Sequence, residues 1–170
     1  MNSLKIQYAK MKTPFGAHLW LAKSTRGVCW IEFGNSEAEF LNKLSRHWPK
    51  MNFAKNSEAL QKPITELMEY FAGRRKKFTF KLAPEGTTFQ RKVWQAVYEI
   101  PFGEVTTYQN IARKIGKAKA ARAVGHANGS NQLPIVIPCH RVIGSNGGLC
   151  GYGGGIELKK MLLKLEGSNF

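Results

Sequence analysis

Short apolar-rich runs separated by turn-forming residues dominate the first third of the chain. Three such runs cover residues 4–11, 17–24 and 27–34, and the sequences TPFG and STRG lie between them. Runs of this length and composition favour strands, and the glycine or proline in each connection favours a turn. The pattern therefore predicts three β-strands near the N-terminus.

Helical patterns follow these runs. Ser36 and Glu39 form a capping-box pattern, and apolar residues then recur at helical spacing from Phe40 onward. A second helix is predicted over 57–73, because Gly73 provides a stop signal at its end. Two helices are therefore expected after the strands.

A change of pattern near residue 84 predicts a domain boundary. The basic segment 74–86 predicts one more strand, which runs into a proline and a glycine. A helix then starts at a second capping box, formed by Thr87 and Gln90. We therefore expect one domain over 1–84 and a second, mostly helical domain over 85–170.

Two short helices are predicted next. The first covers 106–116, is capped by Thr106 or Thr107 and ends at Gly116, and the second lies within 117–129. Two short helices joined by a tight turn that contains glycine resemble a helix-turn-helix, whose second helix would be the recognition element.

The C-terminal part of the chain is predicted to hold a strand, a loop and a helix. The apolar run 133–138 predicts a buried strand, and 144–155 is a glycine-rich loop. An amphipathic helix over 156–167 closes the chain. The overall expectation is an α/β (α+β) protein.

The charge of the chain points to a polyanionic partner. The net charge is +15 at pH 7, all 11 acidic residues are Glu, and none occurs between Val105 and Ile156. A surface of one sign attracts a polyanion and releases counterions when it binds. A basic but unspecialised protein would share the net charge, but the long acid-free stretch favours nucleic acid.

Several classes of protein are disfavoured by the sequence. No apolar run approaches the roughly 20 residues of a membrane span, and the N-terminus lacks the apolar core of a signal peptide. The three cysteines, odd in number and widely spaced, do not suggest a disulfide framework. We therefore expect an intracellular protein, cytosolic or nuclear, without a membrane partner, and assign it to the cytoplasm.

Cofactor and metal sites are not indicated either. The sequence has no glycine-lysine phosphate loop, no Asp to hold magnesium, and no CxxC or HxxxH spacing. We therefore expect neither a cofactor nor a metal.

Small residues dominate the predicted recognition helix. Alanine and glycine occupy most positions of 117–129, and Arg122 is the large side chain in their midst. Small residues let a backbone approach another surface closely, whether that surface is DNA or the protein core. Arg122 is either a solvated surface charge or a probe of a DNA groove.

The adjacent Cys139 and His140 raise the possibility of thiol chemistry. A nearby histidine or positive charge lowers the pKa of a cysteine and makes it nucleophilic. A free cysteine at the end of an apolar segment is also commonly a buried structural residue. The residues alone leave both interpretations open, while Cys29 and Cys150 have no such neighbours.

Four motifs resemble the O6-alkylguanine-DNA alkyltransferases. They are IPCHRVIG, PFGEVTTYQNIA, KAARAVGHA and GYGGG followed by LEG, and they cover residues 87–168 in the order of that family. The N-terminal residues fit the family's variable RNase H-like α/β domain by pattern. The resemblance implies an RNase H-like domain followed by a mostly helical domain with a helix-turn-helix of winged-helix type.

The resemblance implies a DNA-repair activity. A member of the family flips O6-alkylguanine, or O4-alkylthymine, out of duplex DNA and transfers the alkyl group to its own cysteine in one irreversible turnover. Cys139 would be the acceptor, His140 would take its proton through a water, and Glu166 would orient His140. Tyr108 would hydrogen-bond the flipped guanine and stabilise the leaving group.

The resemblance also implies DNA and substrate contacts for a monomer. Arg122 would fill the gap left by the flipped base, and its helix would lie in the minor groove. The DNA-binding residues would be Thr107, Gln109, Ala121, Arg122, Ala123 and Gly125. The substrate-binding residues would be Asn131, Val142, Tyr152, Gly153 and Gly154. The backbone of Cys139 and of Val142 would meet the exocyclic amine of guanine.

Some features depart from the family pattern, and three other functions compete. Some members have Ser at the position of Gly153, and zinc-binding members have N-terminal ligands of which only Cys29 could be a counterpart. A sensor that binds damage without repairing it would usually have Trp at the position of Cys139. A thiol hydrolase would leave the basic helices unexplained. A DNA-binding regulator would not need Cys139.

Overall fold

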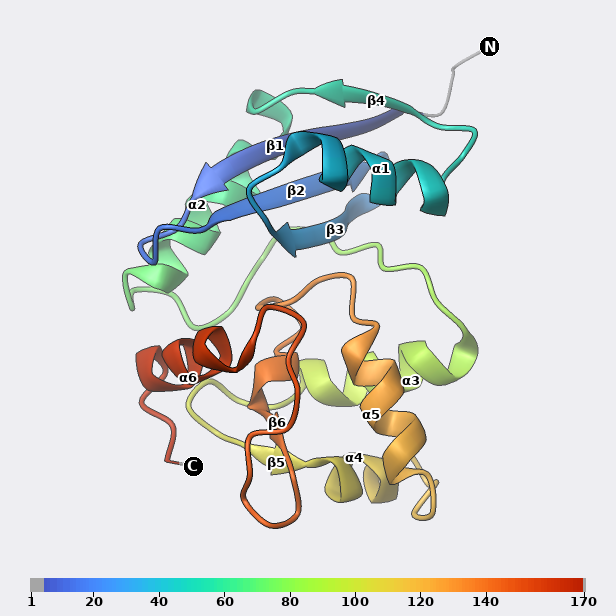
Figure 1. Cartoon of the computed structure of the whole chain (residues 1–170), viewed down its shortest axis with the longest axis vertical. Coiled ribbons are helices and arrows are strands. Elements are labelled where there is room, and N and C mark those ends of the chain that lie inside the picture. The colour runs from blue at the N-terminus through green and yellow to red at the C-terminus, as the bar shows by residue number, and fades with distance from the viewer. Residues whose placement is uncertain (1–4, 170) are drawn as a thin grey trace. The chain divides into compact units, whose positions relative to one another are not determined.

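The chain folds into two compact units, Met1–Pro84 and Glu85–Phe170. The computed structural model describes residues 5–169. Figure 1 shows a sheet with helices in the first unit and mainly helices in the second. This is the mixed α/β fold class that the sequence predicts.

The first unit is built on a four-stranded sheet with the order β3-β2-β1-β4. Its strands are β1 (Lys5–Lys12), β2 (His18–Ser24), β3 (Gly27–Phe33) and β4 (Asn52–Lys55). The pairs β1–β2 and β2–β3 are antiparallel, and β4 pairs parallel to β1. The three predicted strands are confirmed, except that residue 4 lies outside the described residues. The short β4 was not predicted.

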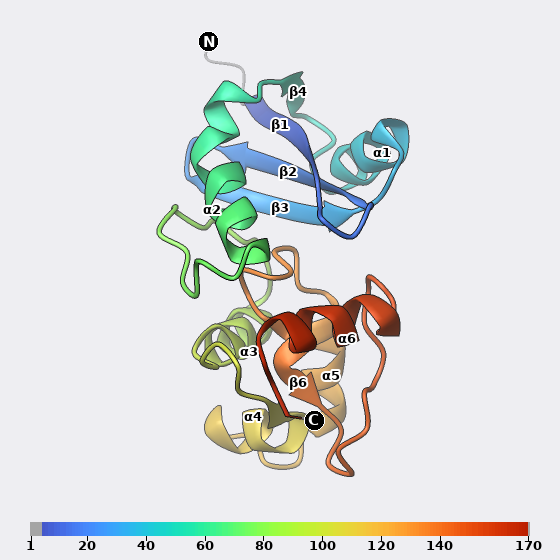
Figure 2. The same cartoon turned by 90° about the vertical axis from the view of Figure 1, so that its left-hand side faces the viewer.

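Two helices cover opposite faces of this sheet (Figure 2). Helix α1 (Glu37–His47) starts at Ser36, whose side chain accepts a hydrogen bond from the Glu39 backbone N–H. The short helix η1 (Glu58–Leu60) leads into α2 (Gln61–Phe71). The helices therefore form as predicted. On the α1 side, Trp20 and Phe40 stack with a centroid separation of 5.3 Å.

The predicted strand over 74–86 is wrong, apart from one isolated bridge between Val28 and Leu82. The buried side chain of Glu66 accepts hydrogen bonds from the backbone N–H of Thr79 at 2.7 Å and from its hydroxyl. A carboxylate thus satisfies groups that a neighbouring strand would otherwise bind. Only the end of the segment returns to the sheet, where Ala83 N–H donates to Val28 O at 2.8 Å.

The second unit gathers short elements around one core. They are α3 (Thr88–Tyr98), β5 (Thr106–Thr107), α4 (Tyr108–Lys114), α5 (Ala121–Gly129), η2 (Cys139–Arg141), β6 (Val142–Ile143) and α6 (Ile156–Leu165). Both hydrogen bonds of the capping box at the start of α3 are present. The helices α4 and α5 pack against each other, as expected of a helix-turn-helix. Trp94 ties α3 to α5, because its Nε1 donates to Ala127 O at 2.7 Å.

The predicted strand over 133–138 is also wrong. This segment is buried but forms a tight turn, with Ile137 N–H donating to Leu133 O at 2.8 Å and Ile135 at a φ of 75°. The side chain of Asn131 replaces a strand partner, because it accepts from Leu133 N–H at 3.0 Å and donates to Ile137 O at 2.8 Å. The turn leads directly into η2, whose first residue is Cys139.

Candidate active site

Cys139 is the first residue of η2 and is 6% exposed. Pro138 precedes it, and the tight turn braced by Asn131 fixes the approach of the chain. In a 3₁₀ helix the side chains of consecutive residues diverge by about a third of a turn. Cys139, His140 and Arg141 therefore project into different surroundings although they are adjacent.

His140 is fully buried and paired with Glu166 at the end of α6. The distance from His140 Nε2 to Glu166 Oε1 is 2.7 Å. In a neutral imidazole the nitrogen that faces a carboxylate carries the proton, so the other is a bare acceptor. That other nitrogen, Nδ1, is buried and has no hydrogen-bond partner among residues 5–169. His140 can therefore take a proton at Nδ1.

Glu166 also forms a bidentate ion pair with Arg141. Arg141 Nε lies 2.7 Å from Glu166 Oε2, and Nη2 lies 2.9 Å from Oε1. Arg141 Nη1 also donates to Ile100 O at 2.5 Å, so the guanidinium is held by a backbone carbonyl as well as by Glu166. Burial by itself would raise the pKa of Glu166, but the hydrogen bonds and charges of His140 and Arg141 lower it to about 2. Glu166 is therefore a carboxylate at neutral pH.

The pKa shifts of Cys139 and His140 favour the uncharged form of both side chains in the absence of substrate. Burial lowers the pKa of His140, against the opposing effect of Glu166. Burial likewise raises the pKa of the Cys139 thiol, although hydrogen bonds from Asn131 and Tyr152 and the charge of Lys159 act in the other direction. A neutral thiol can pass its proton to a neutral imidazole, directly or through a water, when a substrate is in place.

Tyr108 lies at the start of α4 and is half-buried. Burial raises its pKa, with contributions from Cys150 and Cys139, while a hydrogen bond from Asn128 lowers it. Asn128 was not predicted from the sequence; it is buried and donates from Nδ2 to Cys139 O at 3.3 Å. Its position near the end of a small-residue helix carried no signal of this contact. Asn128 therefore links Tyr108 to the backbone of Cys139.

Lys159 is the second site residue that was not predicted from the sequence. It is 0% exposed, and its Nζ donates to Val142 O at 2.6 Å and to Cys150 O at 3.3 Å. A signal for it existed, because Lys159 shares a helical stripe with Leu162, Leu163 and Glu166, all of them buried. A lysine on the apolar stripe of a helix is a candidate for a buried role.

The glycine-rich loop 144–155 carries the remaining predicted substrate residues. Tyr152 is half-buried and acts to lower the pKa of the Cys139 thiol. A Cβ at Gly153 would meet no atom within 4 Å, whereas one at Gly154 would lie 2.5 Å from Leu158 Cδ2. Gly153 therefore borders open space, and Gly154 packs onto α6.

The predicted DNA-binding residues lie on α4, α5 and the residue before α4. Thr107 caps α4 by accepting from Asn110 N–H at 3.1 Å, and Gln109 Nε2 donates to Ala118 O at 2.7 Å across the turn. On α5, Arg122 and Ala123 are exposed, and Ala121 and Gly125 are half-buried. The exposed side of α5 thus presents Arg122 among residues with little bulk.

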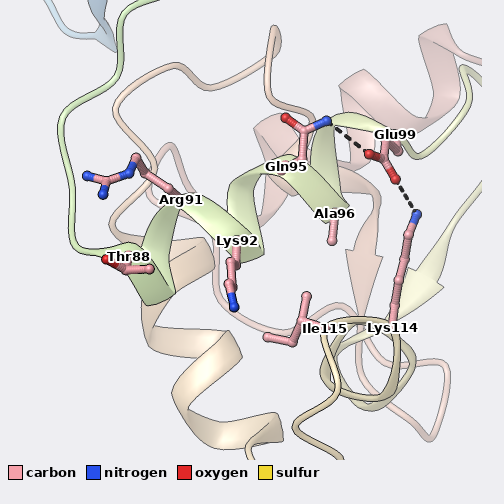
Figure 3. A pocket seen from close by; sticks show the side chains of 8 residues that line it. All are labelled: Thr88, Arg91, Lys92, Gln95, Ala96, Glu99, Lys114 and Ile115. Atoms are coloured by element: carbon pink, nitrogen blue, oxygen red, sulfur yellow. Dashed lines mark hydrogen bonds and ion pairs between the residues drawn. The ribbon is translucent and has the colours of Figure 1, made fainter.

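A hollow of about 530 Å³ lies elsewhere in the second unit (Figure 3). It is lined by Thr88, Arg91, Lys92, Gln95, Ala96, Glu99, Lys114 and Ile115. Lys114 Nζ lies 2.8 Å from Glu99 Oε2 at one side of it. None of the residues around Cys139 lines this hollow, so it is separate from the thiol site.

Within residues 5–169 no three His, Cys, Asp or Glu side chains come together as a metal site. A search of the same residues finds no helix with the length and apolar character needed to cross a membrane.

Comparison with known families gives matches over both units. The family described as "6-O-methylguanine DNA methyltransferase, ribonuclease-like domain" matches residues 6–84. The family described as "6-O-methylguanine DNA methyltransferase, DNA binding domain" matches residues 88–168.

Individual proteins are similar over nearly the whole chain. A methylated-DNA–protein-cysteine methyltransferase of Methanosarcina mazei is 49% identical over 162 residues, which are 95% of this chain and 98% of the relative. Its counterpart from Methanosarcina acetivorans is 45% identical over 161 residues, with the same coverage of both chains.

Solved structures show the same likeness. The Mycobacterium tuberculosis O6-methylguanine methyltransferase superposes with a TM-score of 0.82 at 37% identity, over 95% of this chain and 93% of that chain. The Mycobacterium tuberculosis OGT in complex with DNA gives a TM-score of 0.80 at 38% identity, over 95% and 92%.

Proposed function

The chain belongs to the 6-O-methylguanine DNA methyltransferase family and repairs alkylated DNA by moving the alkyl group to a cysteine, and we propose that Cys139 is that cysteine. The observation that carries this assignment is the contact between Glu166 and His140, the residue that directly follows Cys139. Of the three cysteines, Cys139 directly precedes a histidine of this kind.

The proposed first step is removal of the thiol proton. Nε2–H of His140 donates to Glu166, which leaves Nδ1 free to accept the Cys139 proton through a bridging water. The imidazolium that forms is stabilised by the Glu166 carboxylate, and Arg141 keeps that carboxylate in place. This is the logic of a nucleophile, a base and an orienting acid.

The proposed second step is displacement at the alkyl carbon. The sulfur of Cys139 forms a bond to that carbon while the bond to guanine O6 breaks, and the electron pair of the broken bond stays on guanine. Tyr108 donates its hydroxyl hydrogen toward the guanine ring, where this charge develops. Guanine gains the proton equivalent that the thiol lost, so no cofactor is needed. The thioether has no group that removes it, so each protein molecule acts once.

The target base must leave the duplex to reach a thiol that is 6% exposed. We propose that α5 lies in the minor groove and that Arg122 takes the place of the flipped base. The small residues Ala121, Ala123 and Gly125 allow the close approach, and the exposure of Arg122 supports the role. O4-alkylthymine, with an alkyl group at a similar position, is a further candidate substrate.

The proposal includes a monomer that works in the cytoplasm. A single Cys139, one recognition helix and one duplex suffice for the chemistry above, so a second subunit has no role in it.

The first experiment measures protein mass after incubation with duplex DNA that contains one O6-methylguanine. We expect a gain of one methyl group, located on the peptide with Cys139 and limited to one per molecule. Cys150→Ala is the matched control, since it removes the other thiol near the site and should transfer as well as the wild type. Cys139→Ala should gain no mass.

The other outcomes separate the competing functions. Selective lesion binding without mass gain would identify a sensor. Turnover of a thioester with recovery of the free thiol would identify a hydrolase. A Cys139→Ala variant with unchanged repair would return this residue to a structural role.

A further inference from the structure

The hollow between α3 and the end of α4 carries an excess of positive charge (Figure 3). Its volume of about 530 Å³ lies within the range of about 300–1,000 Å³ that is typical of ligand clefts. Its lining holds three cations and one carboxylate, which are Arg91, Lys92, Lys114 and Glu99. The function proposed above uses none of these side chains, so the hollow has no role in it.

The carboxylate of this lining is already occupied. Glu99 Oε2 lies 2.8 Å from Lys114 Nζ, and Glu99 Oε1 accepts a hydrogen bond from Gln95 Nε2 at 2.9 Å. Glu99 and Lys114 therefore neutralise each other at one side of the hollow. The charges of Arg91 and Lys92 have no counterpart in the lining.

These two cations are available to a ligand. Lys92 has no hydrogen-bond or ion-pair partner among residues 5–169. Arg91 Nη1 donates to Gly86 O, which uses one of the five N–H donors of a guanidinium. Figure 3 shows Lys92 pointing from α3 into the space between the helices, with Arg91 at its edge. The hollow therefore presents two positive charges that the described part of the chain leaves uncompensated.

Apolar and neutral polar side chains complete the lining. Ala96 of α3 is buried and Ile115, which follows α4, is partly buried, while Thr88 and Gln95 are exposed. A matching ligand carries an anion next to an apolar group. The DNA backbone has this alternation, because each phosphate is joined to a deoxyribose with an apolar carbon surface. Arginine, lysine, threonine and glutamine side chains are also common protein contacts to DNA phosphates.

The hollow adjoins the helix-turn-helix along the chain. Lys114 ends α4, and the turn over 116–120 leads from it into α5. Lys117 and Lys119 are exposed on that turn, within the acid-free stretch 105–156. Positive side chains therefore run from the start of α5 along the turn to the edge of the hollow.

We propose that this hollow binds a phosphate and its deoxyribose from the backbone of the duplex that α5 holds, with Lys92 as the main contact and Arg91 as the second. The inference rests on the proposed function for the identity of its ligand. It adds a backbone contact on α3, outside the residues assigned to DNA above. Such a contact positions the protein on the duplex without reading its sequence.

The first test measures the affinity for an undamaged duplex of fixed length over a range of salt concentrations. Lys92→Gln should weaken binding and reduce the slope of log affinity against log salt by about 0.9, the value for one phosphate contact. Lys92→Arg should restore both. Lys164→Gln is the matched control, because Lys164 is an exposed lysine in the last turn of α6. It should keep the wild-type slope.

The second test locates the contact on the wild-type chain. Lysines are acetylated with and without the undamaged duplex, and the modification of each peptide is measured by mass. We expect DNA to protect Lys92 and to leave Lys164 as reactive as in the free protein. Inorganic phosphate and polyglutamate, at the same concentration of charge, should not protect Lys92.

A Lys92→Gln slope equal to that of wild type, or to that of Lys164→Gln, would overturn the proposal. Protection of Lys92 by polyglutamate but not by DNA would assign the hollow to an acidic protein segment. Equal protection by inorganic phosphate would make it a general anion site. Either result would overturn the assignment to DNA. If wild-type protein failed to transfer a methyl group, the proposed function would be wrong, and the salt slopes would still decide whether the hollow binds DNA.

Discussion

At the scale of single residues, Glu166 binds two side chains at once. Its two oxygens face His140 on one side and Arg141 on the other, at 2.7–2.9 Å. A carboxylate shared in this way holds the His140 ring, the proposed base, and anchors the end of α6. Removing one partner of a buried pair leaves an uncompensated charge, at a cost of about 3–5 kcal/mol.

This sharing makes the folded state sensitive to acid. The pKa of Glu166 is lowered to about 2 from an ordinary value of 4.5, so its contribution is complete above pH 4.5 and is lost as the pH falls through 2. The pKa of His140 is also lowered, so its neutral form contributes to the stability of the folded state above pH 6.5. This contribution is lost as the pH falls below 6.5. Stability should therefore decrease steadily toward acid pH.

Urea unfolding of Glu166→Gln and wild type at neutral and acid pH checks this. At neutral pH the variant should be less stable by about 3–5 kcal/mol, and it should lose less than wild type between pH 4.5 and 2. Glu157→Gln removes an exposed glutamate from the same helix and should follow the wild-type curve. Parallel pH curves for Glu166→Gln and wild type would contradict the assignment.

The sequence revealed these residues unevenly. Cys139 and His140 drew attention because they are adjacent, but their roles and that of Glu166 followed only from the family resemblance, since the pair of His140 and Glu166 spans 26 positions. Lys159 and Asn128 were missed because burial of a polar residue depends on tertiary contacts. For Lys159 the helical stripe contained the information, and helical periodicity alone could have identified it.

At the scale of elements, two predicted strands turned out to be turns or irregular chain. In each case a polar side chain supplies the hydrogen bonds of a missing strand: Asn131 for 133–138, and Glu66 for the segment at Thr79. An apolar run shows that a segment is buried but does not show how its backbone is satisfied. Capping boxes and stop glycines, which act locally, predicted the helices correctly.

The dependence of the 133–138 turn on one side chain can be tested with Asn131→Ala. Leu133 N–H would lose its partner, whereas Ile137 O would keep the hydrogen bond that it accepts from Cys139 N–H at 2.7 Å. The one buried group left unpaired should cost about 1–3 kcal/mol. The turn leads into Cys139, so methyl transfer should slow as well. Chemical denaturation and single-turnover rates measure the two effects.

Asn146→Ala is the control for this substitution. Asn146 also forms a local turn, accepting from Gly148 N–H at 3.0 Å, but it is exposed. Its loss should change the free energy of unfolding by less than about 0.5 kcal/mol. Equal effects of the two alanines would mean that the buried turn does not depend on Asn131.

At the scale of the whole molecule, positive charge is divided between the two units. Residues 85–170 hold 11 of the 26 lysines and arginines and 5 of the 11 glutamates, for a net +6, and residues 1–84 hold 15 and 6, for a net +9. The larger charge thus lies outside the helix-turn-helix unit. General attraction to DNA involves the whole chain, whereas binding of individual phosphates is local.

A charge-matched pair of variants separates these two effects. Lys117→Gln with Lys119→Gln removes two exposed charges from the turn between α4 and α5, and Lys76→Gln with Lys77→Gln removes two from the first unit. The first pair should reduce the slope of log affinity against log salt by about one for each phosphate that the protein no longer binds. The second should leave the slope unchanged. Equal slopes for both pairs would mean that other residues bind the phosphates.

The burial of Cys139 has a consequence for the lifetime of the unused protein. A molecule that acts once must keep its thiol reduced until damage occurs, and oxidants attack exposed thiolates first. Cys139 is 6% exposed and its pKa is raised by burial, so it is shielded on both counts, whereas Cys150 lies exposed nearby. The burial of Cys139, the proposed acceptor, therefore also protects its thiol from oxidation until damage occurs.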